Sequence, residues 1–473
     1  MKYVFYDFET DSTSTTWGQI LEVGAILCNQ EFEILDRYEA RCRIKPGVIP
    51  EPMALIINKT SIEMLRKTNL SHFQFVNQLE QTFKSWSPAV FIGYNNISFD
   101  EEHMRKTFFK CLKDPYLTSF NGNSRGDILT LARSSDLYYP GSIKTPMSDK
   151  GNAVFKLDQL APLNGIVHES AHTAMSDVIA TLEMAKLLSN KAPNVWKASL
   201  MTTTKSGVQD IISKEKIFCT NEYFYGRARN FCVTYICDHP VYKWKMCFDL
   251  KNDASDFLQM DYDSLKEALS KSPKVIRSVK DNKSPLLMSA NYAINFDGYR
   301  QIGMAKLHER AELLRNNEEF KKKVSRILEE EALSKQDTQS QESIMAEESI
   351  YAGGFAKEND KAVMTEFHKA EWKDKLAIAD KFSEERFNYF AKKIIYEETP
   401  QLLPSDLYKQ IHREVAKRVL STNDEKWNTI PKSYKEIDDL RDKFDNEKDV
   451  EKLSLLEDIN NYLMELEKEY KAA

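Results

Sequence analysis

The sequence lacks the features that mark several common classes of protein. No apolar run approaches the roughly 18 residues of a membrane-spanning helix, and the first eight residues are too short and too acidic for a signal peptide. The seven cysteines form no Cys-x-x-Cys pair and have no zinc-finger spacing. Their odd number, without a secretory signal, predicts reduced thiols in a cytoplasmic protein with no membrane attachment.

An excess of positive charge is also missing, because the formal net charge is −6 at pH 7. Any nucleic-acid path must therefore be a local basic feature. No internal repeat is evident. The length of 473 residues predicts two or three domains, and an apolar content of 42% is enough to build their cores.

The first ten residues carry the strongest chemical signal. Apolar and aromatic residues run from Tyr3 to Phe8 and predict a core strand that Asp7 and Glu9 interrupt. Residues two apart share a face of a strand and lie about 7 Å apart. Two carboxylates on one face repel each other unless a cation lies between them. The pair predicts either a divalent metal or a strand end whose acids reach water.

Two later stretches favour the metal. The apolar run 89–92 leads through Gly93 to Asp100, which is predicted to start a helix. His172 precedes an amphipathic helix that carries Asp177. Four acids and one histidine suit Mg²⁺ or Mn²⁺ better than zinc.

The ordered set Asp-x-Glu, a distant Asp and His-x4-Asp resembles the DEDD 3′→5′ exonucleases of the histidine subclass. The whole chain resembles the bacterial exodeoxyribonuclease I family. The stretches that carry this second resemblance are Tyr94–Asp100, Asp114–Tyr116, Asn123–Arg125, Phe155–Leu160, Ala171–Asp177 and Tyr351–Phe355.

The resemblance implies an α/β fold: a ribonuclease H-like exonuclease domain with a mixed sheet (1–190), an SH3-like β-rich domain ending in a polar linker (193–347) and a C-terminal helical domain (350–473). It also implies a C-shaped molecule that encloses single-stranded DNA. The residue patterns themselves predict strands, helices, a linker and a helical end. These elements are strands at 20–27, 32–44, 231–237, 242–248 and 275–276, helices at 61–65 and 73–83, a polar linker at 333–348, and an apolar helix face from Leu453 to Tyr470.

Family membership further implies a catalytic centre with two Mg²⁺ ions about 4 Å apart, which Mn²⁺ can replace. Asp7 would bridge the ions, Glu9 and Asp177 would complete the first site, and Asp100 would act largely through water. His172 would be the general base, since its pKa lies near neutrality. A single histidine before a helix is otherwise a cap or a surface residue.

Substrate contacts are also implied by the resemblance. Glu9, Thr10, Asn95 and Lys156 would contact the terminal nucleotides. Asn95 has an alternative role in ordering its loop, and Lys156 replaces an arginine and so loses bidentate phosphate binding. The expected DNA path comprises Arg105, Tyr116, Phe120, Arg133, Lys274, Arg277 and Lys280. The last three belong to a basic ladder, Lys271 to Lys283; such a run by itself is more often a solvated face, and the adjoining nuclease motifs make it a candidate wall of a DNA channel.

The expected function is degradation of single-stranded DNA from the 3′ end to 5′-mononucleotides, by a monomer that serves DNA repair or recombination. The acidic C-terminal tail of single-stranded DNA-binding protein is an expected second partner. However, Tyr138-Tyr139-Pro140-Gly141 lacks the arginine that the family uses for that tail. Two alternatives are a DEDD exoribonuclease, which the long chain after Leu188 disfavours, and a non-catalytic nucleic-acid-binding module.

Overall fold

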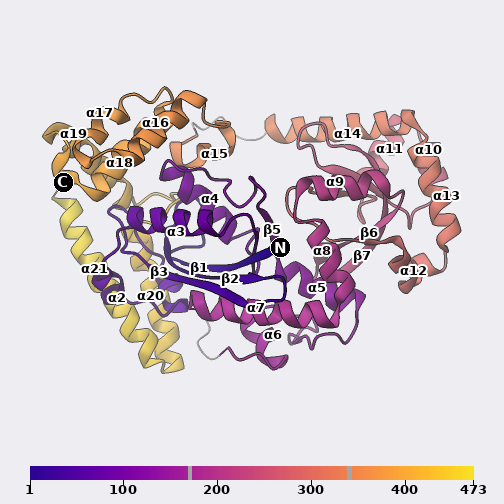
Figure 1. Ribbon diagram of the computed structural model, residues 1–473, viewed down its shortest axis with the longest axis horizontal. Helices are drawn as coiled ribbons and strands as arrows, with labels where there is room; N and C mark the ends of the chain where they lie inside the picture. Colours follow the sequence, from indigo (N-terminus) through magenta and orange to yellow (C-terminus); the bar gives the residue numbers. More distant parts are fainter. Residues whose placement is uncertain (169–172, 338–343, 473) are drawn as a thin grey trace.

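The computed structural model describes residues 1–168, 173–337 and 344–472. Two five-stranded sheets and a set of helices near the C-terminus form three parts of the molecule (Figure 1). The first sheet lies in the middle, with the second sheet on one side and the C-terminal helices on the other. Within the described residues no helix is both long enough and apolar enough to cross a membrane.

The first sheet has the order β3-β2-β1-β4-β5 and is mixed. Its central strand β1 is antiparallel to β2 and parallel to β4, and β5 is parallel to β4. The strands are β1 (Lys2–Thr10), β2 (Ile20–Asn29), β3 (Ile34–Arg41), β4 (Val90–Gly93) and β5 (Ser124–Asp127). The expected α/β fold with a mixed sheet is confirmed.

Alternation along β1 supplies a core to each face of this sheet. Tyr3 and Phe5 pack on the side of α5 and α7, while Val4 and Tyr6 pack on the side of α3 and α4. Both faces are therefore covered by helices, which explains why almost the whole strand is apolar. The helices of this part are α1 (Pro52–Ile57), α2 (Ile62–Lys67), α3 (His72–Trp86), α4 (Asp100–Lys110), α5 (Ile128–Tyr138), α6 (Leu157–Leu163) and α7 (Ala174–Lys191), followed by α8 (Pro193–Met201) and α9 (Lys205–Lys214).

The second sheet is antiparallel throughout, with the order β10-β6-β7-β8-β9. Its strands are β6 (Phe218–Phe224), β7 (Arg227–Asp238), β8 (Lys245–Asp249), β9 (Ile276–Val279) and β10 (Leu287–Ser289). Its helices are α10 (Ala254–Leu258), α11 (Tyr262–Ser270), α12 (Asp297–Arg300), α13 (Met304–Arg315) and α14 (Glu318–Asp337).

The polar linker expected at 333–348 is partly wrong. Helix α14 continues through Asp337, and a short 3₁₀ turn spans Ala346–Glu348. The residues between 338 and 343 lie outside the described part. Ser334 and Lys335 are exposed residues of α14. They follow Ala332, the last buried residue before them, so the helix continues beyond its packed part into solvent.

The last part is helical, as expected. Its helices are α15 (Ser349–Ala352), α16 (Glu358–Lys369), α17 (Lys375–Ala379), α18 (Glu385–Glu398), α19 (Ser405–Val419), α20 (Ile430–Glu447) and α21 (Val450–Lys471). Leu456, Ile459 and Leu463 of α21 are fully buried in one core with Leu55 of α1 and Leu65 of α2. The helical end therefore packs directly on the first part.

Glu102 on α4 joins all three parts. Its carboxylate accepts a hydrogen bond from Lys283 Nζ, in the loop between β9 and β10, at 3.0 Å. It also accepts one from the Tyr351 hydroxyl of α15 at 2.5 Å. A single side chain two positions after Asp100 thus ties the second and third parts to the first.

Candidate metal centre and nucleic-acid interface

Three carboxylates from two elements form one cluster. Asp7 and Glu9 lie on β1 and Asp177 lies in the first turn of α7. Each offers one oxygen, and the three oxygens all lie within 4.8 Å of one another. Glu9 and Asp177 are 168 positions apart in the sequence, yet the strand and the helix are folded so that one cation could contact all three side chains.

A glycine on the neighbouring strand allows α7 to come this close. Gly24 of β2 is the register partner of Asp7. A Cβ atom at Gly24 would lie 2.5 Å from the backbone nitrogen of Met175 and 2.6 Å from the carbonyl carbon of Ala174. Any side chain there would push the start of α7, and with it Asp177, away from β1.

Asp100 stands beside this cluster at the first residue of α4. Its Oδ1 accepts a hydrogen bond from the backbone N–H of Phe8 at 3.0 Å, so it is fastened to β1 between the two acids of that strand. Asp100 is only 2% exposed. Burial raises the pKa of Asp100 to about 8, although the Phe8 hydrogen bond works in the opposite direction.

The acids destabilise one another's charged forms. Burial, and then the charges of Asp100, Glu9 and Asp177, raise the pKa of Asp7 well above its usual value. Burial, followed by the charge of Asp177, raises the pKa of Glu9 to about 8. A divalent cation would relieve both effects, and carboxylate oxygens are the ligands that hard cations prefer. The residues therefore fit a divalent metal ion.

Sequence reasoning missed a further acid, Glu22. It lies directly opposite Glu9 on β2, is buried, and forms an ion pair with Arg41 of β3. Its charge raises the pKa of Glu9, whereas that of Arg41 lowers it. The sequence did carry a signal for it, because Glu22 is the single charged residue inside the apolar run 20–27.

The proposed general base, His172, lies outside the described residues, so its role stays a prediction. The structure brings a different histidine to the cluster. His168 Nε2 lies 2.6 Å from Asp177 Oδ1, and the His168 side chain is 1% exposed. Sequence reasoning did not single out His168, because no spacing relates it to the acids.

The residues expected to meet the terminal nucleotides lie at the ends of three different elements, β1, β4 and α6. Thr10 ends β1, where its hydroxyl donates to the Ser12 carbonyl at 2.9 Å. Asn95 is exposed with a positive φ of 63°, and its N–H donates to Asp127 at 3.0 Å. This fits the loop-ordering role for Asn95. Lys156 is exposed at the N-terminus of α6.

Aromatic residues and a cation meet where the first and last parts join. The Arg105 guanidinium lies 5.1 Å from the Tyr116 ring centroid. Phe120 and Phe355 each pack edge-on against Tyr116, with ring centroids 6.0 and 5.4 Å away. Phe120 and Phe355 are 53% and 73% exposed, which leaves two apolar ring surfaces free for stacking.

Arg133 occupies a different boundary of the first part. Its guanidinium lies 4.0 Å from the ring centroid of Tyr223, on β6 of the second part. Nearby, the Tyr139 hydroxyl lies 2.9 Å from that of Tyr292. The structure therefore places Arg133 against the second part, whereas Arg105 and Tyr116 contact Phe355 of the last part through the ring cluster.

The expectation of one basic ladder from Lys271 to Lys283 is wrong. Arg277 is buried, pairs with Glu222 at 3.0 Å and lies over the Phe231 ring at 3.8 Å. Lys274 Nζ donates to the Ser270 carbonyl at 2.8 Å, and Lys280 Nζ lies 4.3 Å from the Trp244 ring centroid. A spacing of three cannot keep to one face of a strand whose side chains alternate with a period of two. DNA contacts by Lys274, Arg277 and Lys280 stay predictions.

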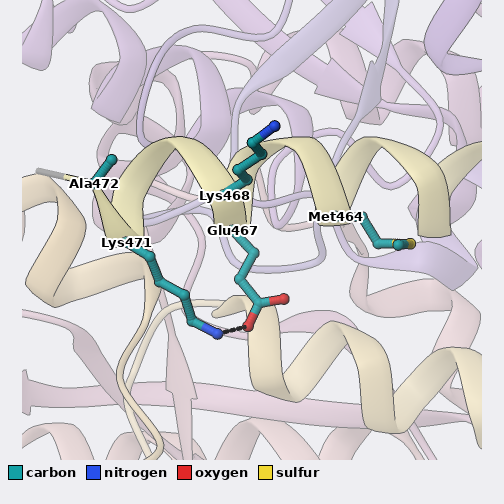
Figure 2. Close-up of a pocket in the computed structure, with 5 residues that line it drawn as sticks. All are labelled: Met464, Glu467, Lys468, Lys471 and Ala472. Carbon is teal, nitrogen blue, oxygen red and sulfur yellow. Dashed lines mark ion pairs between the residues drawn. The ribbon is translucent and has the colours of Figure 1, made fainter.

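A shallow hollow on the outer surface of α21 carries no comparable chemistry. Figure 2 shows its five lining residues, Met464, Glu467, Lys468, Lys471 and Ala472. Its ion pair is that of Lys471 with Glu467, 2.7 Å apart and one helical turn away. Such a pair is typical of a solvated helix face.

Comparisons with known proteins agree with this architecture. Three family models match in chain order: "Exonuclease" at residues 4–185, "Exonuclease I SH3-like domain" at 204–330 and "Exonuclease I C-terminal domain" at 344–466. Exodeoxyribonuclease I of Escherichia coli is 27% identical over 413 residues, covering 82% of this chain and 85% of that protein. A Buchnera aphidicola exodeoxyribonuclease I is 31% identical over 235 residues, covering 49% of this chain and 48% of that protein.

A solved structure of E. coli exonuclease I with a dA16 oligonucleotide has the same fold, with a TM-score of 0.83 at 24% identity, covering 98% of this chain and 99% of that one. An apo structure of exonuclease I gives a TM-score of 0.79 at the same identity and coverage. The central part, the SH3-like part and the helical end are thus matched in order over almost the whole length, and the chain belongs to the exonuclease I family.

Proposed function

We propose that this protein is a metal-dependent exonuclease that digests single-stranded DNA from the 3′ end and releases 5′-mononucleotides. The observation that carries the proposal is the cluster of Asp7, Glu9 and Asp177 oxygens within 4.8 Å, beside the buried Asp100. The substrate class is supported by the relatives, which are named exodeoxyribonuclease I, and by the E. coli structures with dA16 and dT13 oligonucleotides.

The acids have distinct tasks in this proposal. Asp7, Glu9 and Asp177 hold Mg²⁺, for which Mn²⁺ can substitute, and Asp100 completes the centre through water. When bound, a pair of such ions supplies an activated water and charge neutralisation at the leaving oxygen. The Phe8 N–H fixes Asp100 at a constant distance from β1. The Arg41 ion pair limits the repulsion that Glu22 exerts on Glu9.

Proton transfer from the attacking water is assigned to His172, whose ordinary pKa suits a general base. Thr10, at the end of β1, and the exposed Asn95 and Lys156 are assigned to the last nucleotides. Upstream bases are assigned to stacking on the exposed Phe120 and on Tyr116, which packs against it. Arg105 lies against the Tyr116 ring but is buried and paired with Glu101 at 3.1 Å, so its own contact with the strand stays a prediction. We also keep the proposal that four basic residues outside this ring cluster contact DNA phosphates: Arg133, Lys274, Arg277 and Lys280.

Three wider expectations also stay proposals. The domain division is 1–190, 193–347 and 350–473. The seven free cysteines of the described residues suit a reducing compartment, so we place the enzyme in the cytoplasm, where it would act in DNA repair or recombination. We propose that it is a monomer that also binds the acidic tail of single-stranded DNA-binding protein. One solved structure is of SSB and exonuclease I in complex with an inhibitor.

The decisive experiment compares end-labelled single-stranded DNA, duplex DNA and RNA as substrates, with Mg²⁺ and with EDTA. We expect the 3′ end of single-stranded DNA to be degraded to mononucleotides, with EDTA abolishing the reaction. Asp7→Asn should be inactive, whereas Asp149→Asn, at an exposed loop position, should match the wild type. Preferred digestion of RNA would replace this proposal by the exoribonuclease alternative. Binding without any cleavage would make the protein a binding module.

A further inference from the structure

A small polar cavity lies where the first part meets the C-terminal helices. The segment after β1 forms one wall, including Asp11 and Trp17, together with Lys45 and Lys110. Lys393 of α18 and Arg418 of α19 form the opposite wall. Its volume is about 50 Å³, which is room for a few water molecules or one tetrahedral oxyanion.

Cations outnumber their partners around this cavity. Arg418 and Lys393 share one carboxylate oxygen of the buried Glu347, at 2.8 and 3.4 Å. These two cations hold the pKa of Glu347 well below its usual value, against the effect of its burial. Lys45 has a single long ion pair with Glu397 at 3.6 Å. With Asp11, which also lines the cavity, three carboxylates face the four lining cations.

Among the described residues, Lys110 is the one lining cation without an ion pair; the charge of Glu347 acts on it, but less than those of Lys45 and Lys393. Its Nζ donates to the Thr16 carbonyl at 2.8 Å and forms no ion pair within the described part of the chain. Burial, and then the charges of Lys45 and Lys393, lower the pKa of Lys110 to about 7. The remaining carboxylate of the cavity, Asp11, accepts the Gln19 N–H through Oδ1, while its buried Oδ2 has no hydrogen-bond partner.

The geometry points to a binding site for one phosphate-sized oxyanion, held by Lys110 and Lys45 from one side and by Lys393 and Arg418 from the other. The anion would give Lys110 an ion-pair partner. The cavity would hold one phosphoryl group but not a base or sugar. The ligand chemistry is a phosphate dianion or phosphate monoester. Its source is free inorganic phosphate or the phosphate of a mononucleotide whose base lies outside.

Two tryptophans orient the arginine of this site. The Trp17 and Trp427 rings pack edge-on with centroids 5.1 Å apart. The Arg418 guanidinium lies 5.2 and 4.9 Å from their centroids. Trp17 belongs to the first part and Trp427 to the last. The ring pair and the bound anion would therefore both stabilise the contact between these two parts. Because the segment 11–18 directly follows Thr10, occupancy would steady the end of β1.

The test is binding of inorganic phosphate to the full-length protein in EDTA, at constant ionic strength set with chloride. Calorimetry and thermal unfolding should both detect saturable binding, with a melting temperature that rises with phosphate concentration. Lys110→Met should weaken binding at least about tenfold. The variant should fold, because it removes a partly buried charge that forms no ion pair among the described residues and fills the same space. It is expected to be at least as stable as the wild type without phosphate.

Lys106→Met is the matched control. Lys106 lies one turn earlier on α4 and donates to the hydroxyls of Thr15 and Thr16, at 2.6 and 2.9 Å, but does not line the cavity. It should keep wild-type phosphate affinity, and so should Asp7→Asn, which separates this site from the metal centre.

Absence of phosphate binding by the wild type, or equal binding by Lys110→Met, would overturn the proposal. If dAMP binds with the same dependence on Lys110, the source is a nucleotide; if only inorganic phosphate does, it is the free anion. Neither result depends on DNA cleavage.

Discussion

The charge on Glu9 should make the metal-free protein progressively less stable as pH rises. Its pKa is raised from 4.5 to about 8, first by burial and then by Asp177, Glu22 and Asp100. The folded state therefore keeps a proton that the unfolded chain releases above about pH 4.5. The stability linked to this group is complete below pH 4.5 and is lost as pH rises to about 8. Glu9→Gln keeps the shape and removes the charge.

The size of the effect follows from the shift. A change of about 3.5 pKa units at about 1.4 kcal/mol per unit gives an upper value of about 5 kcal/mol. Because the neighbouring carboxylates titrate together with Glu9, we expect about 2–5 kcal/mol. For domains of this size, that corresponds to a rise in Tm of roughly 5–15 °C at pH 9. The difference should vanish near pH 4.5.

The assay is thermal unfolding of both proteins in EDTA between pH 4.5 and 9, with Asp149→Asn as the control for removing an exposed acid. At pH 8, added Mg²⁺ should make the wild type melt at a higher temperature than Glu9→Gln, since the wild type gains metal-binding energy that the variant has lost. A pH-independent difference, or a variant less stable than the wild type at pH 9 in EDTA, would refute the account of the cluster as mutually repelling acids.

Three further outcomes are expected. His172→Ala should lower single-turnover cleavage by about 10²–10⁴ with unchanged affinity for single-stranded DNA, and lost affinity with intact turnover would make it a substrate contact instead. Phe120→Ala should weaken strand binding by about 1–3 kcal/mol in fluorescence titrations; the exposed Tyr225→Ala serves as control, and equal losses would argue against stacking. Glu102→Gln weakens the junction with Lys283 and Tyr351, so it should shorten the run of nucleotides removed per binding event, measured with a trap strand. Equal run lengths for Glu102→Gln and the wild type would show that this junction does not contribute to processive digestion.

Local pattern was sufficient for most elements of the chain. The apolar run of β1 and its two-residue spacing placed Asp7 and Glu9 on one face, because strand periodicity depends only on neighbouring residues. The same holds for α21, whose apolar positions three or four apart became its buried face. The order of acids along the chain also indicated which side chains belong to one centre, once their resemblance to DEDD nucleases was seen.

Periodicity was misleading where the wrong period was assumed or where a boundary depended on packing. The three-residue spacing of Lys274, Arg277 and Lys280 suggested a continuous face, yet Arg277 turns into the protein to meet Glu222. Polar composition around Ser334 suggested a linker, although α14 continues through it to Asp337 as an exposed final stretch of helix. Composition reports exposure and does not distinguish an exposed helix face from a loop.

Distances between remote segments were decided only by the tertiary structure. The approach of Asp177 to β1 depends on the missing side chain of Gly24, and the charge of Glu22 beside Glu9 depends on strand register. The shared carboxylate of Glu102 and the cluster of cations around Lys110 likewise arise from packing between parts far apart in sequence. Sequence spacing fixes which face of its own element a side chain occupies. Only the packing of elements fixes which charges from other elements it meets, and those charges set the chemistry of the site.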